Sequence, residues 1–297
     1  MSLDKYVEDS EENLIMAARN VRESVDVIET IGVFKNRLIN ERMRKWKEKQ
    51  LHGQYARQTD EVSNDERWLW LKDGGLKRET ESLIIAAQNQ SIRTNHVKAK
   101  IDKSQGNSKC RMCQQSDETI NHILSECPKL AQKEYKRRHD WVGKRIHWEV
   151  CRVNGITVPP KWYNHVPQPV IENEMCKILW DFNVQTDHVI EARRPDMIVI
   201  DKTTRKCVIV DFAVPFDSRV SAKEQEKILK YQDLARELKK LWDLPIKVVP
   251  IVIGALGAPS VNLRKWIGEL RIETRIVELQ KTTLLHSARI LRKVLEV

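Results

Sequence analysis

Apolar residues recur at helical spacing through the N-terminal third of the chain. Positions three and four residues apart share one face of a helix, so this spacing predicts helices between Glu11 and Lys103. Lysine and arginine residues crowd positions 35–49, which predicts one strongly basic helix that ends near Gly53. The apolar positions that carry the pattern are Leu14, Ala17, Ala18, Val21, Val25 and Ile28, followed later by Leu83, Ile84, Ala87 and Ile92.

The pattern changes from position 170 onward to that of a mixed α/β segment. Short runs rich in valine and isoleucine predict strands over 197–200 and 207–214, and the turn-like stretch between them makes the two strands antiparallel neighbours. A third run, over 247–253, predicts another strand. Helices are predicted over 171–182, 222–242, 261–270 and 284–295.

Prolines separate these two parts of the chain. Pro159, Pro160, Pro167 and Pro169 interrupt a stretch that has no regular apolar spacing, which is typical of an extended bridge. We therefore expect a helical linker region over 1–106, a segment bearing cysteine and histidine over 107–151, a bridge over 152–169 and a further domain over 170–297. The predicted fold class is α+β or α/β, with a helical N-terminal arm and a mixed sheet flanked by helices.

Composition narrows the class of protein. The 52 lysine and arginine residues outnumber the 42 aspartate and glutamate residues, so the formal net charge is +10 and a polyanionic partner is favoured. No apolar run approaches the ~20 residues that span a bilayer, so we expect no membrane partner. The acidic first residues lack an apolar core, so we expect no secretory signal peptide. Six cysteines then indicate reduced thiols or metal ligands.

Four potential metal ligands lie within eighteen residues of one another. Cys110 and Cys113 form a Cys-x2-Cys pair, and His122 and Cys127 form a His-x4-Cys pair. Three thiolates and one imidazole make a complete tetrahedral set, so we predict a structural zinc ion with no position left for a catalytic water. The alternative is a chance cluster of buried thiols. Cys151 and His139 are possible substitute ligands, whereas Cys176 and Cys207 have the apolar neighbours of core residues.

A basic segment follows these ligands directly. Cations over 133–147 alternate with Tyr135, Trp141 and Trp148, a combination suited to phosphates and stacked bases. We predict nucleic-acid contacts here and along the helix over 35–49, against the alternative of a solvated helix face. The predicted nucleic-acid-binding residues are Lys136, Arg137, Arg138, Lys144 and Arg145, together with Arg193 and Arg194, which precede a predicted strand.

Two aspartates mark the same end of the two predicted neighbouring strands. Asp196 begins one strand and Asp211 lies near the end of the next, with fourteen residues between them. Converging carboxylates repel one another unless a cation neutralises them, and Mg²⁺ or Mn²⁺ suits oxygen ligands. Such a site would hydrolyse phosphodiesters, with an ammonium nearby to assist. The alternative is a pair of solubilising strand-end charges.

The candidate ammonium groups lie on the helix predicted after Asp211. Lys230 is the first choice and Lys227 the second, and Lys223 shares their face of the helix. Glu172 and Glu174, on the helix predicted over 171–182, are candidates for a further acid.

The order of these motifs resembles the C-terminal region of polyproteins from site-specific non-LTR retrotransposons. In that family a Cys-Cys-His-Cys zinc knuckle precedes a restriction-like endonuclease of the PD-(D/E)xK superfamily. The matching residues are Cys110, Cys113, His122 and Cys127, then Arg194-Pro195-Asp196, Asp211 and the helix that carries Lys227, Lys230 and Tyr231. The resemblance spans residues 77–257.

The resemblance implies metal-dependent nicking of target DNA in the nucleus, to start target-primed reverse transcription. Its partners are then DNA and, as a second candidate, element RNA. Ala213 stands where a simple Asp-x-Lys motif has lysine, so the amine is expected from the later helix. The sequence contains no Tyr-x-Asp-Asp motif, so we expect a fragment or remnant without reverse transcriptase. The leading hypothesis is an endonuclease module. The alternatives are an inactive nucleic-acid-binding remnant and a remnant with no selected activity, and the sequence leaves the oligomeric state open.

Overall fold

The structure, a computed structural model, describes residues 27–62 and 64–295. The chain divides into two compact units, Met1–Gln54 and Tyr55–Val297, which are described separately. The apolar positions between Leu14 and Val25 lie outside the described residues. No helix in the described part of the chain has both the length and the apolar character needed to cross a membrane.

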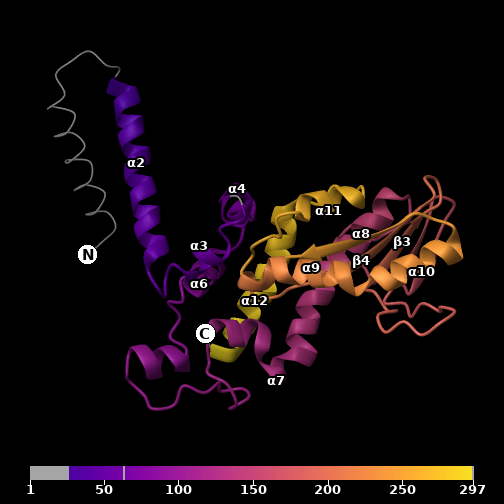
Figure 1. The fold of residues 1–297 in the computed structure, drawn as a ribbon. Coiled ribbons are helices and arrows are strands. Elements are labelled where there is room, and N and C mark those ends of the chain that lie inside the picture. The colour runs from indigo at the N-terminus through magenta and orange to yellow at the C-terminus, as the bar shows by residue number, and fades with distance from the viewer. Residues whose placement is uncertain (1–26, 63, 296–297) are drawn as a thin grey trace. The chain divides into compact units, whose positions relative to one another are not determined.

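The first unit contains the helix α2 (Val27–Glu48), which confirms the predicted basic helix (Figure 1). Its described side chains are mostly exposed. Ion pairs one helical turn apart join Arg44 to Glu48 at 2.6 Å and Lys45 to Glu41 at 2.8 Å. Such exposed pairs add only a few tenths of a kcal/mol to helix stability, about 0.3–0.5 each.

The second unit is built around a five-stranded sheet with the order β1-β2-β3-β4-β5. Neighbours from β1 to β4 are antiparallel, and β5 pairs parallel to β4. The predicted strand pair is confirmed, because Met197 of β3 lies opposite Val210 of β4. The strands are β1 (Val170–Glu172), β2 (Cys176–Trp180), β3 (Met197–Asp201), β4 (Lys206–Ala213) and β5 (Ile246–Val252).

The helix predicted over 171–182 is wrong, because this stretch forms the hairpin of β1 and β2. The side chain of Asn173 accepts hydrogen bonds from the backbone N–H groups of Met175 and Cys176, which closes a tight turn. The following apolar run then pairs with β3 along its whole length. A short apolar run of this kind does not distinguish a buried strand from a buried helix segment.

Helices cover both faces of the sheet. On one face, α8 (Lys136–Val153) packs on β2, β3 and β4 through Val142, Ile146 and Val150, with α11 (Leu263–Glu269) and α12 (Ile276–Leu295) in the same apolar cluster. On the other face, α10 (Gln232–Trp242) packs through Leu234 and Leu238 (Figure 1). These two layers exclude water from both faces of β3 and β4, whose runs are accordingly apolar on both sides.

The helix predicted over 222–242 is interrupted. It consists of α9 (Val220–Lys230) and α10, with Tyr231 between them in a non-helical conformation. The break turns the Tyr231 side chain toward the sheet, where its hydroxyl group reaches Asp211. The position of the break therefore bears directly on the candidate site.

The Pro-rich stretch joins two parts of one core, since residues 55–297 form a single compact unit and α8 precedes the stretch while the sheet follows it. Trp148 donates a hydrogen bond to the carbonyl of Pro159 at 2.8 Å, and Lys144 donates one to the carbonyl of Tyr163 at 2.8 Å. The segment therefore lies along α8.

The remaining helical elements complete the described chain. In the second unit, α6 carries the predicted apolar positions Ile84 and Ala87, and Ile84 packs against Leu284 and Ala288 of α12. The remaining elements are α3 (Gln54–Gln58), α4 (Asn64–Arg67), α5 (Leu69–Asp73), α6 (Arg78–Gln88), η1 (Val97–Ile101), η2 (His122–Glu126), α7 (Pro128–Leu130), η3 (Ala131–Tyr135), η4 (Trp162–Asn164) and η5 (Asp217–Arg219).

Candidate metal centre and carboxylate site

The four predicted zinc ligands come together in the second unit. One ligand atom from each of Cys110, Cys113, His122 and Cys127 lies within 4.8 Å of the other three, and all four residues are buried. Cys113 Sγ is 3.3 Å from His122 Nε2, and Cys110 Sγ is 4.0 Å from Cys127 Sγ. Ligand atoms of a tetrahedral zinc site are about 3.3–3.8 Å apart, as bond lengths of 2.0–2.3 Å require. The donor set therefore fits one zinc ion.

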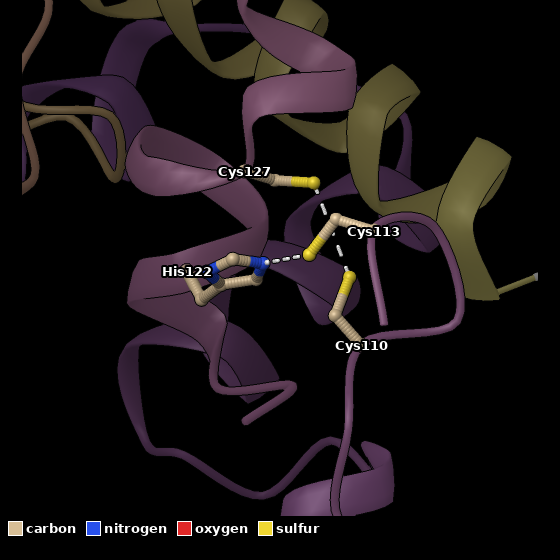
Figure 2. A group of neighbouring side chains, drawn as sticks. All are labelled: Cys110, Cys113, His122 and Cys127. Atoms are coloured by element: carbon tan, nitrogen blue, oxygen red, sulfur yellow. Dashed lines mark hydrogen bonds between the residues drawn. The ribbon is translucent and has the colours of Figure 1, made fainter. Parts of the chain in front are cut away.

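Local structure directs these side chains toward one another. Cys110 and Cys113 lie on a tight loop that a β-bridge between Lys109 and Asp117 closes. His122 begins η2 and Cys127 directly follows it, and Figure 2 shows their side chains facing the loop. The buried carboxylate of Glu118 accepts hydrogen bonds from the backbone and guanidinium of Arg111, which holds the loop in shape.

The three thiols differ in their acidity. Burial disfavours the Cys113 thiolate, but hydrogen bonds from the backbone of Ser116 and Gln115 and from His122 outweigh burial and lower its pKa to about 6. Burial and the neighbouring cysteines raise the pKa of Cys127 to about 12. Thiolates so close together repel one another, and a divalent cation removes that repulsion, so zinc binding would release protons here.

The metal centre is packed into the rest of its unit. Its cysteines share an apolar cluster with Ile290, Leu291 and Val294 of α12, at the far end of the chain sequence. Neither His139 nor Cys151 belongs to the group of four, so neither residue replaces a ligand of this metal centre. Cys176 and Cys207 are buried, as expected of core residues.

The two predicted carboxylates lie together at one end of β3 and β4. Asp196 directly precedes Met197, and Asp211 directly follows Val210, the partner of Met197. The Asp196 carboxylate also accepts a hydrogen bond from the backbone N–H of Phe212 at 2.7 Å. Asp211 is 2 % exposed, and burial together with the Asp196 charge raises its pKa.

Among the described residues, Lys227 is the lysine that forms an ion pair with Asp211. Its Nζ is 2.5 Å from Asp211 Oδ2, while Tyr231 donates a hydrogen bond to Asp211 Oδ1 at 2.6 Å. Lys230 Nζ lies 3.0 Å from the Tyr231 hydroxyl instead, so the favoured lysine reaches the carboxylate only through Tyr231. Lys223 pairs with Glu226.

The glutamates proposed as a further acid are elsewhere. Glu172 pairs with Lys177 and Lys202, and Glu174 lies in the same hairpin. This hairpin meets the end of β3 that carries Asp201, opposite the end that follows Asp196. The expectation that Glu172 or Glu174 supplies a further acid is therefore wrong. The hairpin that forms in place of the predicted helix lies at the end of β3 opposite Asp196.

His139 is a site residue that sequence reasoning did not assign to the carboxylates. Its Nε2 is 3.2 Å from Asp196 Oδ2, and its Nδ1 is 3.0 Å from Asp140 Oδ1. Burial opposes its charge, but these two carboxylates prevail and raise the pKa of His139 to about 10. The resulting imidazolium and the Phe212 N–H hold the pKa of Asp196 below its ordinary value despite burial. No local sequence pattern indicates a contact across 57 positions.

A cleft of about 810 Å³ opens beside Asp196. It contains both cationic and aromatic side chains, from α8 and from the loops at this end of the sheet. The lining residues used below are Lys136, Lys144, Arg194, Trp141, Trp180 and Asp196.

Residues 38–133 match the family model described as zinc-binding in reverse transcriptase. The chain contains a zinc-binding domain of a retroelement-type protein. This zinc-binding domain includes all four metal ligands, whereas α8 and the sheet with Asp196 and Asp211 follow the matched residues. None of the curated proteins matches the chain.

Two of the predicted nucleic-acid-binding residues beyond the zinc-binding domain have internal partners. Arg138 is 1 % exposed and donates hydrogen bonds to Ser287 Oγ and to the carbonyls of Leu124 and Val214, so the expected phosphate contact is corrected. Arg145 pairs with Glu278 at 2.6 Å.

The other basic candidates lie nearer to solvent. Lys136 is exposed and Arg137 is partly exposed. Arg193 and Arg194 are exposed, and Arg194 pairs with Asp181 at 2.7 Å. Lys144, Lys136 and Arg194 all line the cleft.

Proposed function

We propose that this chain is the DNA-nicking part of a retrotransposon-type protein, with the zinc-binding domain supporting a metal-dependent endonuclease on the five-stranded sheet. The observation that carries the proposal is the gathering of Asp196, Asp211 and Lys227, of which Asp196 lines a cleft with cationic and aromatic side chains. Strand-end carboxylates and a helix-borne lysine on a mixed sheet support a restriction-like fold of the PD-(D/E)xK superfamily.

Asp196 and Asp211 are the residues that would hold Mg²⁺ or Mn²⁺. Hard cations prefer carboxylate oxygens as ligands. The backbone N–H of Phe212 and the imidazole of His139 both form their hydrogen bonds with Oδ2 of Asp196. Asp211 is buried and has an ammonium as its counter-charge. When bound, a divalent cation lowers the pKa of a coordinated water and offsets charge on the phosphate.

The cationic side chains have separate roles in this proposal. Lys227 lies against Asp211, where its ammonium would orient a water molecule or stabilise negative charge on the phosphate. Lys230 acts through the Tyr231 hydroxyl, which itself fixes the Asp211 carboxylate. His139 holds the Asp196 carboxylate and neutralises part of its charge.

The chemistry of the cleft supports DNA as the substrate. Lys136, Lys144 and Arg194 offer positive charge to the phosphate backbone. The rings of Trp141 and Trp180 line the same cleft and add the aromatic surface that stacking of bases requires. Element RNA shares this chemistry and is a second candidate partner. A chromosomal target implies a nuclear location, which the basic run 136–138 supports.

Nicking of a supercoiled plasmid by the purified chain tests the proposal. We expect nicked circles with Mg²⁺ or Mn²⁺ and none with EDTA. Asp196→Asn and Asp211→Asn should each lower the rate by roughly 100-fold or more, because a ligand to the cation is lost. Lys227→Met should lower the rate, and Lys230→Met should lower it less.

The matched control is Asp201→Asn, at the opposite end of β3 from Asp196. It should nick at the wild-type rate. Nicking that persists in EDTA or in Asp196→Asn contradicts the proposed site, since contamination or another centre would then cut the DNA.

A second function, nucleic-acid binding without cleavage, is favoured by one observation. The charges of Asp211 and Asp196 are already compensated internally by Lys227 and His139. Under this alternative, the wild-type chain binds DNA with a steep dependence on salt but does not nick it with any divalent cation. Charge reversal of Lys136 should then weaken binding, while Asp211→Asn should leave it unchanged.

A further inference from the structure

A second cluster of metal-binding side chains lies on the sheet-facing side of α8. His147 and Cys151 are four residues apart on this helix, so they lie one turn apart on the same face. His165 joins them from the Pro-rich segment, directly after η4. One ligand atom from each residue lies within 4.8 Å of the other two.

The cluster is closed to solvent. His147 and Cys151 are 0 % exposed and His165 is 5 % exposed. The ring of Trp180 stands edge-on to that of His147, with centroids 5.2 Å apart. The atom of His147 that faces Cys151 and His165 is Nδ1, while the buried Nε2 on the other side of the ring has no hydrogen-bond partner among the described residues.

The distances within the cluster are near those of a zinc site. Cys151 Sγ is 3.5 Å from His147 Nδ1, which agrees with the roughly 3.5 Å between a sulfur and a nitrogen bound to one zinc ion. His147 Nδ1 is 2.7 Å from His165 Nε2, a distance at which one ring donates a hydrogen bond to the other. An ion in place of that proton requires about 3.3 Å between the nitrogens, a small movement of one ring.

The surrounding contacts position His165 in advance. Trp148 and Lys144 of α8 donate hydrogen bonds to the carbonyls of Pro159 and Tyr163, so the segment is fixed before η4 and within it. Trp162 of η4 also packs edge-on against Trp141, with centroids 5.5 Å apart. Ordering the third ligand therefore costs little when an ion binds.

We propose that His147, Cys151 and His165 form a second metal site, which takes a borderline-soft divalent ion such as Zn²⁺. Two imidazoles and one thiolate match the ligand preference of zinc, and a water or another donor completes the coordination. The ion links α8 to the segment that leads into the sheet. This site is independent of the proposed nuclease activity and lies outside the stretch matched as a zinc-binding domain.

Metal content of the full chain tests this site. The protein is loaded with Zn²⁺, freed of loose ions by dialysis, and analysed for zinc by mass spectrometry. We expect two zinc ions per chain in the wild type and one in both Cys151→Ser and His165→Gln. Cys110→Ser should also retain one, because it removes only the ion of the zinc-binding domain.

Cys207→Ser is the matched control, because Cys207 is an equally buried cysteine on the opposite side of the sheet. It should retain both ions. A wild-type content of one, or a Cys151→Ser content of two, overturns the proposal and leaves the cluster as hydrogen-bonded core side chains.

X-ray absorption at the zinc edge gives a test that needs no folded variant. The zinc-binding domain alone supplies three sulfur ligands to its ion, whereas two sites average about two sulfurs and more nitrogen per zinc. An average of two sulfurs supports the second site. An average of three in the zinc-loaded wild type overturns it.

Discussion

At the residue scale, Arg137 and Arg138 are adjacent residues of the same type whose roles differ because only Arg138 is buried. Arg137 is partly exposed, whereas Arg138 is enclosed, and burial lowers the pKa of its guanidinium to about 10. Its hydrogen bonds tie α8 to Leu124 of the zinc-binding domain, to Ser287 of α12 and to Val214 after β4. One side chain thus links three parts of the unit.

Replacing Arg138 should therefore cost stability. We expect Arg138→Ala to lower the free energy of unfolding by roughly 3 kcal/mol or more, because it leaves two carbonyls unsatisfied and a large cavity. Arg137→Ala should change it by less than about 0.5 kcal/mol. Urea unfolding of both variants measures the difference, and equal small losses would contradict the internal role.

Asp217 predicts a pH dependence of stability. Its carboxylate accepts hydrogen bonds from the backbone of Leu256 and Ala258, but burial prevails and raises its pKa to about 7. Between about pH 5 and 7 the unfolded carboxyl has lost its proton while the folded one retains it, so raising the pH favours unfolding. Above pH 7 both states are ionised and the contribution levels off.

We expect Asp217 to contribute a fall in the free energy of unfolding between pH 5 and 7, of up to ~1.4 kcal/mol per pH unit. The free energy of unfolding of Asp217→Asn should lack this contribution, so it should rise more, or fall less, than that of the wild type over the same range. Asp201→Asn is the control, since the pKa of Asp201 is lowered and should not contribute to that slope. Identical slopes for wild type and Asp217→Asn would exclude Asp217 as the cause.

At the scale of elements, the close approach of α8 to the sheet depends on Gly143. A Cβ atom at this position would lie 2.7 Å from the Trp180 ring and 2.9 Å from the Phe212 ring. Glycine lowers helix propensity, so its place in the middle of α8 reflects packing. By contrast, a Cβ atom at Gly268 of α11 meets nothing within 4 Å.

These two glycines give a matched pair of variants. Gly143→Ala should destabilise the chain by about 1–3 kcal/mol, because α8 must move away from β2 and β4. Gly268→Ala should be neutral or stabilise it by up to about 1 kcal/mol through helix propensity. Thermal unfolding compares them, and stabilisation by both changes would disprove the close contact.

At the scale of the whole second unit, the metal centre and the last helix share one apolar cluster. Cys110 and Cys127 pack with Leu291 and Val294, so the zinc-binding domain does not stand apart from the sheet. Short metal-binding segments obtain most of their folding free energy from the ion, about 10–16 kcal/mol in finger peptides. Loss of zinc should therefore weaken α12 as well.

We expect chelation of zinc, or Cys110→Ser, to lower the thermal midpoint of the unit by ~10 °C or more. Added Zn²⁺ should restore the wild-type protein and fail to restore Cys110→Ser. Differential scanning calorimetry follows the transition, with Cys207→Ser as a folded control. An unchanged midpoint after proven removal of zinc would contradict the shared cluster.

Sequence alone determined the features that depend on neighbours along the chain. The zinc ligands lie within eighteen residues, and the ligand types together with their spacing were enough to predict the cluster. The paired strands β3 and β4 were also predictable, because their apolar runs are joined by a short turn. Their register in turn brings Asp196 and Asp211 together.

Only the tertiary structure decided the features that depend on distant contacts. Lys227 rather than Lys230 pairs with Asp211, and α8 brings His139 to Asp196. The pairing of β2 with β3 turned a predicted helix into a hairpin. Spacing along the chain encodes one helix or strand at a time, whereas burial and charge pairing arise when elements far apart in sequence pack together.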